Sequence, residues 1–153
     1  MDKVMVTLLL MVAGVVCSLV LLNAVYPAIT SSSGAIVDAS AKIDDRIRSS
    51  IAIIEMSHSG NDAYIWIKNV GTAPISGISN SDVFFGPEGN FARIPYGGTV
   101  APYWTYTIEN DTRWGPSATL KLTIYYTSIA SGEYYFKFTI PNGISAQDYY
   151  SVP

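Results

Sequence analysis

The sequence predicts an α+β protein in which a long N-terminal hydrophobic α-helix is followed by an antiparallel, immunoglobulin-like β-sandwich head. Three observations carry this prediction: an uncharged run over residues 4–25, isoleucines at helical spacing beyond it, and alternating apolar and polar residues after residue 60. We therefore divide the chain of 153 residues into a hydrophobic polymerisation or transmembrane helix over residues 1–56 and a head domain over residues 57–153.

The uncharged run has the length of a membrane-spanning helix. Its 22 residues extend over roughly 33 Å, close to the hydrocarbon thickness of a bilayer. A secretory signal peptide has a shorter apolar core and a small-residue cleavage site, so we expect the run to stay in the working protein. Its apolar residues are expected to form the dry core of a helix bundle: Val4, Leu8, Leu9, Val12, Val15, Val16, Leu19 and Leu22.

An apolar stripe continues the helical pattern beyond this run. Charged residues fall mostly between five isoleucines that recur at intervals of 7, 4, 4 and 3, namely Ile36, Ile43, Ile47, Ile51 and Ile54. Pro27 interrupts the pattern, and we expect a kink there rather than a break, because neighbouring groups can satisfy the freed carbonyl. A helix over residues 4–56 would be about 80 Å long. A small head cannot cover that length, so the stripe predicts contact with copies of the chain or with another protein.

Strands are predicted throughout the head. Apolar residues alternate with polar ones, with β-branched and aromatic residues prominent, over residues 64–68, 82–85, 91–94, 103–108, 120–124 and 134–140. Glycine, proline and asparagine occupy the connections between these segments, as in turns. Tyrosine doublets at 125–126, 134–135 and 149–150 predict one inward and one outward ring each, because successive strand residues point to opposite faces. Outward tyrosines suit protein contacts.

Composition excludes several kinds of chemistry. Nine Lys and Arg against twelve Asp and Glu give a net charge of −3, which disfavours nucleic acid as a partner. With one cysteine, Cys17, and one histidine, His58, the chain has no disulfide and no imidazole pair. We expect His58 to be a solvated linker residue and Cys17 to pack. We therefore predict no catalytic residue, metal, cofactor or small-molecule substrate, and hence no enzyme.

A glycosylation motif lies in the head. Asn110-Asp111-Thr112 has the N-x-S/T pattern without proline in the middle, so Asn110 is a candidate acceptor of an N-linked glycan if the head lies outside the cell. Motifs this short also arise by chance.

The chain resembles a known family. A hydrophobic helix leads into Trp-Ile-Lys-Asn-Val-Gly-Thr at 66–72 and Ser-Asp-Val-Phe-Phe-Gly at 81–86, which looks like the archaellins and the related accessory proteins F and G of the archaeal flagellar system. The resemblance implies a class III signal peptide, removal of a basic leader by a prepilin-type peptidase and polymerisation through the helices. Only Met1-Asp2-Lys3 precede Val4 and no glycine marks a cut, so Met1 is either the processed N-terminus or an uncleaved one.

Two functions fit these features. The first is a structural subunit of an extracellular archaellum-type motility filament, a homo-oligomer of many copies that resides in the membrane before assembly. The alternative is a membrane-anchored accessory or stator protein whose head binds an envelope (S-layer) protein or caps a filament.

Overall fold

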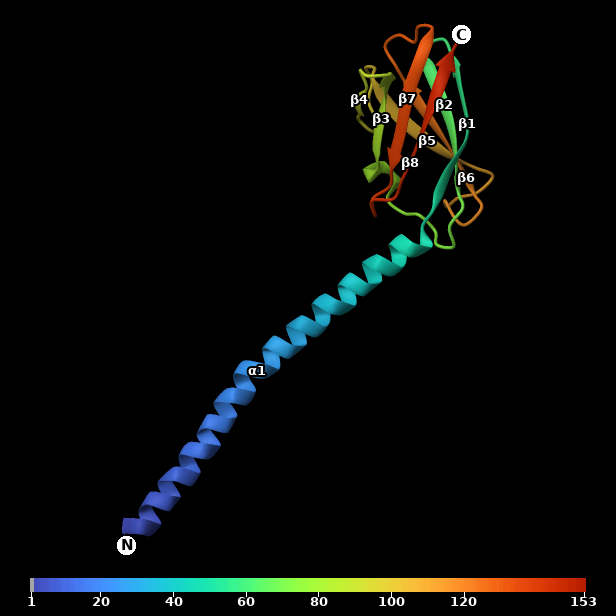
Figure 1. The fold of residues 1–153 in the computed structure, drawn as a ribbon. Helices are drawn as coiled ribbons and strands as arrows, with labels where there is room; N and C mark the ends of the chain where they lie inside the picture. The colour runs from blue at the N-terminus through green and yellow to red at the C-terminus, as the bar shows by residue number, and fades with distance from the viewer. Residues whose placement is uncertain (1) are drawn as a thin grey trace. The chain divides into compact units, whose positions relative to one another are not determined.

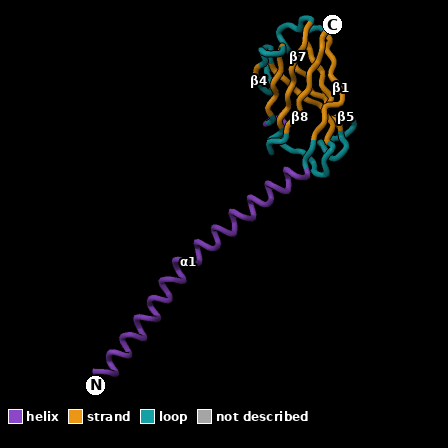
Figure 2. Tube along the Cα trace, in the orientation of Figure 1, coloured by secondary structure: helices purple, strands orange, loops and turns teal. Residues whose placement is uncertain are grey.

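The structure is a computed structural model that describes the backbone of residues 2–153 and the side chains of residues 2–27 and 39–153. It contains one long helix and a head built from two sheets (Figures 1 and 2). The contacts divide the chain into two units, one up to Lys42 and one from Ile43 onward. The last helical residues therefore belong to the same compact unit as the head. Met1 lies outside the described residues.

Helix α1 (Asp2–Arg48) is one element that contains Pro27, so the prediction that this proline does not break the helix is confirmed. The predicted end near Met56 is wrong, because the helix stops at Arg48. Two residues then lead into strand β1 (Ile51–Ser59). The helix therefore does not extend through residue 56, and Ile51 and Ile54 belong to the sheet.

A β-bulge explains why the start of β1 resembles a helix in the sequence. The pairing of β1 with β2 shifts between Ile53 and Glu55, which leaves Ile54 without a partner. An extra residue in a strand destroys the strict period of two. Ile51, on one side of the bulge, is 8% exposed, whereas Ile54 within it is 55% exposed. Their spacing of three residues therefore arises from a bulged strand.

The head consists of two four-stranded antiparallel sheets. Sheet A has the order β1-β2-β6-β5 and sheet C has the order β4-β3-β7-β8. The remaining strands are β2 (Asp62–Asn69), β3 (Asp82–Pro87), β4 (Ala92–Ile94), β5 (Tyr103–Glu109), β6 (Thr119–Tyr125), β7 (Gly132–Thr139) and β8 (Ser145–Val152). The predicted α+β class with a β-sandwich head is thus confirmed.

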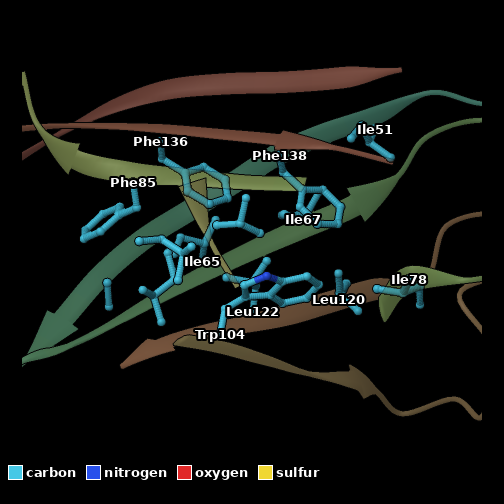
Figure 3. Packing of buried hydrophobic residues seen from close by; sticks show 14 of the residues in the cluster. Ile51, Ile65, Ile67, Ile78, Phe85, Trp104, Leu120, Leu122, Phe136 and Phe138 are labelled. Atoms are coloured by element: carbon cyan, nitrogen blue, oxygen red, sulfur yellow. The ribbon is translucent and has the colours of Figure 1, made fainter. Parts of the chain in front are cut away.

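The core lies between the two sheets (Figure 3). Ile65 and Ile67 of β2 and Leu122 of β6 face Phe136 and Phe138 of β7, and all five side chains are fully buried. Alternation explains this arrangement, because every second residue of these strands points inward. Burial of these large apolar side chains is the main force that holds the sandwich together.

All six predicted strands exist, and two strands were not predicted. The sequence pattern did not predict β1 or β8. Strand β8 is an edge strand with only one buried residue, Val152. A strand that buries so little shows no apolar alternation. The orientation of the tyrosine doublets is confirmed: Tyr134 is 3% exposed and Tyr135 lies on the outer face, while Tyr149 is 53% exposed and Tyr150 packs against the core.

Candidate membrane anchor and docking surface

The apolar helix exposes its side chains on all sides. The eight residues expected in a filament core are between 52% and 72% exposed: Val4, Leu8, Leu9, Val12, Val15, Val16, Leu19 and Leu22. Residues Asp2–Pro27 form a stretch of 26 residues that is long and apolar enough to cross a membrane, with no part of it buried inside the protein. A helix that is apolar all round requires a hydrophobic environment.

The polar residues of this stretch are adapted to such an environment. The Thr7 hydroxyl donates to the carbonyls of Lys3 and Val4 at 3.0 and 2.9 Å, and the Ser18 hydroxyl donates to the Gly14 carbonyl at 2.9 Å. Each hydroxyl therefore has a hydrogen bond within its own helix. This matters in lipid, where an unsatisfied polar group costs several kcal/mol.

The predicted isoleucine seam is only partly a helical feature. Ile43 and Ile47 are on α1 and are 58% and 77% exposed, so the chain itself does not cover them. The side chain of Ile36 lies outside the described residues. Ile51 and Ile54 lie in β1, as stated above, so the seam proposed to run through them does not exist as a helical stripe.

Two loops of the head hold the end of α1. The backbone N–H groups of Thr72 and Ala73 donate to the Arg48 carbonyl at 2.8 and 3.3 Å, which satisfies a carbonyl that the helix leaves free. The Asn142 amide donates to the Ser49 hydroxyl at 2.8 Å, and that hydroxyl donates to the Asp45 carbonyl at 2.6 Å. The helix end is thus tied to loops that follow β2 and β7.

Gly71 and Asn69 make this attachment possible. A Cβ atom on Gly71 would collide with the Arg48 carbonyl oxygen and would lie 2.6 Å from the Ser50 nitrogen. Asn69 is fully buried; its amide donates to the carbonyls of Ala73 and Trp114, and its oxygen accepts from the Gly71 N–H. The sequence predicted a turn around Gly71 but not the role of either residue at the helix end, because the helix was expected to end near Met56.

An aromatic row crosses the outer face of sheet C. Phe91, Tyr135 and Tyr149 follow one another with ring centroids 4.5 and 5.3 Å apart. The side chains of Phe91 and Tyr149 are 47% and 53% exposed. Phe91 reaches the sheet because Gly86 has no side chain: a Cβ there would lie 2.7 Å from the Phe91 Cα. We call these three rings the aromatic row.

The outer face of sheet A is also aromatic but is more covered. Tyr64 and Trp66 lie under the Lys121 ammonium group, which is 4.8 and 5.3 Å from their ring centroids. Tyr103 and Tyr125 stack at 4.6 Å. All four rings are half-buried within the chain. The aromatic row of sheet C is therefore the better candidate for contact with another protein, since exposed tyrosine and phenylalanine are typical of interface cores.

His58 is not the solvated linker residue that the sequence suggested. It lies half-buried in β1, with Nδ1 2.9 Å from the Tyr150 hydroxyl of β8 and the two rings edge to face. The hydrogen bond joins the edge strands of the two sheets. Cys17 is exposed on the apolar part of α1.

Three further features concern the candidate glycan acceptor, possible metal ligands and a partly buried tyrosine. Asn110 lies exposed in the loop after β5 with a φ of 57°. Among the residues that the structure describes, no group of three or more His, Cys, Asp or Glu is placed to hold a metal. Burial raises the pKa of Tyr126, and the neighbouring Tyr134 phenol adds to the rise.

The fold and these surfaces define a class of protein in which a single apolar helix is followed by a β-sandwich head. No protein-family model matches the chain. An uncharacterized protein of Archaeoglobus fulgidus is 27% identical over 161 aligned residues, which cover 97% of this chain and 98% of that protein.

Solved structures are more informative. The archaellum periplasmic stator protein FlaG of Sulfolobus acidocaldarius superposes with a TM-score of 0.61 at 28% identity, covering 67% of this chain and 99% of that one. The FlaF–FlaG stator complex of the same organism gives a TM-score of 0.60 at 28% identity, covering 65% and 87%. These structural neighbours are archaellum accessory proteins. They support the accessory part of the family resemblance and give no support to the archaellin filament subunit itself.

Proposed function

We propose that this protein is a membrane-anchored accessory protein of an archaellum-type motor, in which the helix spans the membrane once and the head acts as part of a stator. The observation that carries this proposal is the match to the solved FlaG chain, which covers 99% of that chain and 67% of this one. The proposal gives the protein a structural role without catalysis, and it replaces the filament subunit as the preferred interpretation.

The similar FlaG is a periplasmic protein, and the charge next to the apolar helix is compatible with a head on the outer side. Lys3 lies directly beside the run, whereas the first positive residues after Pro27 are Lys42 and Arg46, at least 15 residues beyond it. Positive residues near the end of a span are retained in the cytoplasm. The head then lies outside the cytoplasm, next to the cell envelope, where a stator partner would be found.

The partner in this proposal is a second archaellum-associated or envelope protein, bound through the aromatic row. A complex of FlaF with FlaG exists for the similar proteins. Tyr149 and Phe91 offer half-exposed rings on a rigid sheet, and interface energy is concentrated in such aromatic residues. An S-layer protein is one candidate for this partner.

Fractionation of cells tests the choice between stator and filament. The proposal expects the chain in membranes and not in filaments sheared from the cell surface. If the chain were the main component of sheared filaments, the filament subunit would be the correct function instead.

Chemical crosslinking in cells, followed by purification of the full chain in detergent, tests the docking surface. We expect Tyr149→Ala to reduce partner capture about tenfold, which corresponds to a loss of about 1.4 kcal/mol. Val100→Ala is the matched control, because Val100 is 80% exposed but lies outside the aromatic row. Equal capture by both variants would exclude the aromatic row as the docking surface.

A further inference from the structure

The loop between β5 and β6 presents the only N-x-S/T motif of the chain. Asn110 follows β5 directly and is exposed, and its side-chain amide makes no hydrogen bond with any residue that the structure describes. Asp111 folds the motif into a turn, because its Oδ1 accepts from the N–H groups of Thr112 at 2.6 Å and Arg113 at 3.4 Å. The three side chains are all exposed, so the motif is open to a modifying enzyme.

We propose that Asn110 carries an N-linked glycan transferred from a polyprenyl-phosphate-linked oligosaccharide. This rests on the proposed function, which places the head on the outer side of the membrane, where such donors are used. Asn110 Nδ2 forms a bond to C1 of the first sugar. The bond between C1 and the phosphate oxygen breaks, the lipid phosphate leaves with the bonding electron pair, and the amide loses one proton.

The folded head tolerates a glycan at this position. Trp114 fixes the far side of the loop: it is 1% exposed, its Nε1 donates to the Ala118 carbonyl at 3.1 Å, and its carbonyl accepts from the Ile75 N–H at 3.0 Å. The Asn110 side chain is exposed and makes no hydrogen bond, within the described part of the chain, that a sugar would displace. A glycan attached there projects into solvent without disturbing the core.

The position also leaves the proposed docking surface free. Asn110 follows β5, the edge strand of sheet A, whereas the aromatic row lies on the outer face of sheet C. The glycan therefore shields one layer of the sandwich and leaves the other available to a protein partner.

Mass spectrometry of the protein purified from its own host tests the proposal. Trypsin cleavage after Arg93 and Arg113 releases residues 94–113, which contain the motif. We expect this peptide to gain the mass of whole sugar residues, located on Asn110 by fragmentation. Asn110→Gln and Thr112→Ala should lose the added mass completely, whereas Thr112→Ser, which preserves the motif, should retain it.

A second measurement separates this proposal from the proposed function. Ser128 is exposed on the head, so a Ser128→Cys variant can be labelled on intact cells with a membrane-impermeant maleimide. Labelling together with a modified peptide supports both proposals. Labelling with an unmodified peptide overturns the glycan and leaves the stator function intact. Labelling only after lysis overturns both.

Discussion

Replacing Gly71 with alanine tests whether the end of α1 is rigidly held by the head. The added Cβ would collide with the Arg48 carbonyl oxygen, and it would lie 2.6 Å from the Ser50 nitrogen and 3.1 Å from the Ser49 carbonyl carbon. These are backbone atoms, so no flexible side chain can move aside. Overpacking of this kind costs about 1–3 kcal/mol.

Relief of the collision requires the loop to move away from the helix. The movement would lengthen the hydrogen bonds from Thr72 and Ala73 to Arg48, and each lost bond costs about 1 kcal/mol. Because the Asn69 oxygen accepts from the Gly71 N–H while its amide holds Trp114, the disturbance reaches the core. We expect Gly71→Ala to lower the free energy of unfolding by about 3–5 kcal/mol.

Urea unfolding of the full chain in detergent measures this effect. The three tryptophans, Trp66, Trp104 and Trp114, all lie in the head, so their fluorescence reports on the sandwich alone. Gly115→Ala is the control, because a Cβ there meets no atom within 4 Å, and we expect a change within about 0.5 kcal/mol. A Gly71→Ala variant as stable as this control would show that the junction is not closely packed.

Two further predictions concern the anchor and the core. Leu9→Asp combined with Val16→Asp should release the protein from membranes washed with alkaline carbonate, because each aspartate costs about 3 kcal/mol within a span; continued retention would contradict a membrane-spanning helix. Since burial raises the pKa of Tyr126, the native state holds this proton more tightly than the unfolded state. The resulting stability is complete below about pH 10 and falls as the pH rises through the native pKa. Tyr126→Phe should flatten this decline in urea titrations, and an unchanged decline would contradict the prediction.

The periodicity of the sequence was sufficient for most of the fold. Strands such as β2 and β7 bury every second residue, so their alternation is visible without knowledge of their neighbours. The apolar run of α1 is equally clear, because each residue faces the same kind of environment. Local pattern and tertiary structure agree in these elements, and the predictions made from them were correct.

The same reasoning failed where contacts distant in sequence decide the structure. Ile51 and Ile54 fit a helical stripe by spacing, but the pairing of β1 with β2 and the bulge at Ile54 place them in a sheet. The helix end at Arg48 depends on N–H donors from residues 72 and 73. Likewise, the aromatic row joins residue 91 to residue 149. No local pattern contains these pairings.

The junction has a consequence for the proposed stator role. A stator must pass force between an envelope partner and the membrane, and a flexible linker would let the head pivot under load. Here Ser49 and Ser50 alone separate α1 from β1, so sheet A continues directly from the helix end. Sheet C reaches the same point through Asn142, in the connection between β7 and β8, which donates to the Ser49 hydroxyl. In the proposed stator, force applied to the aromatic row on sheet C would therefore pass to the last turn of the helix through this hydrogen bond and through the packed core.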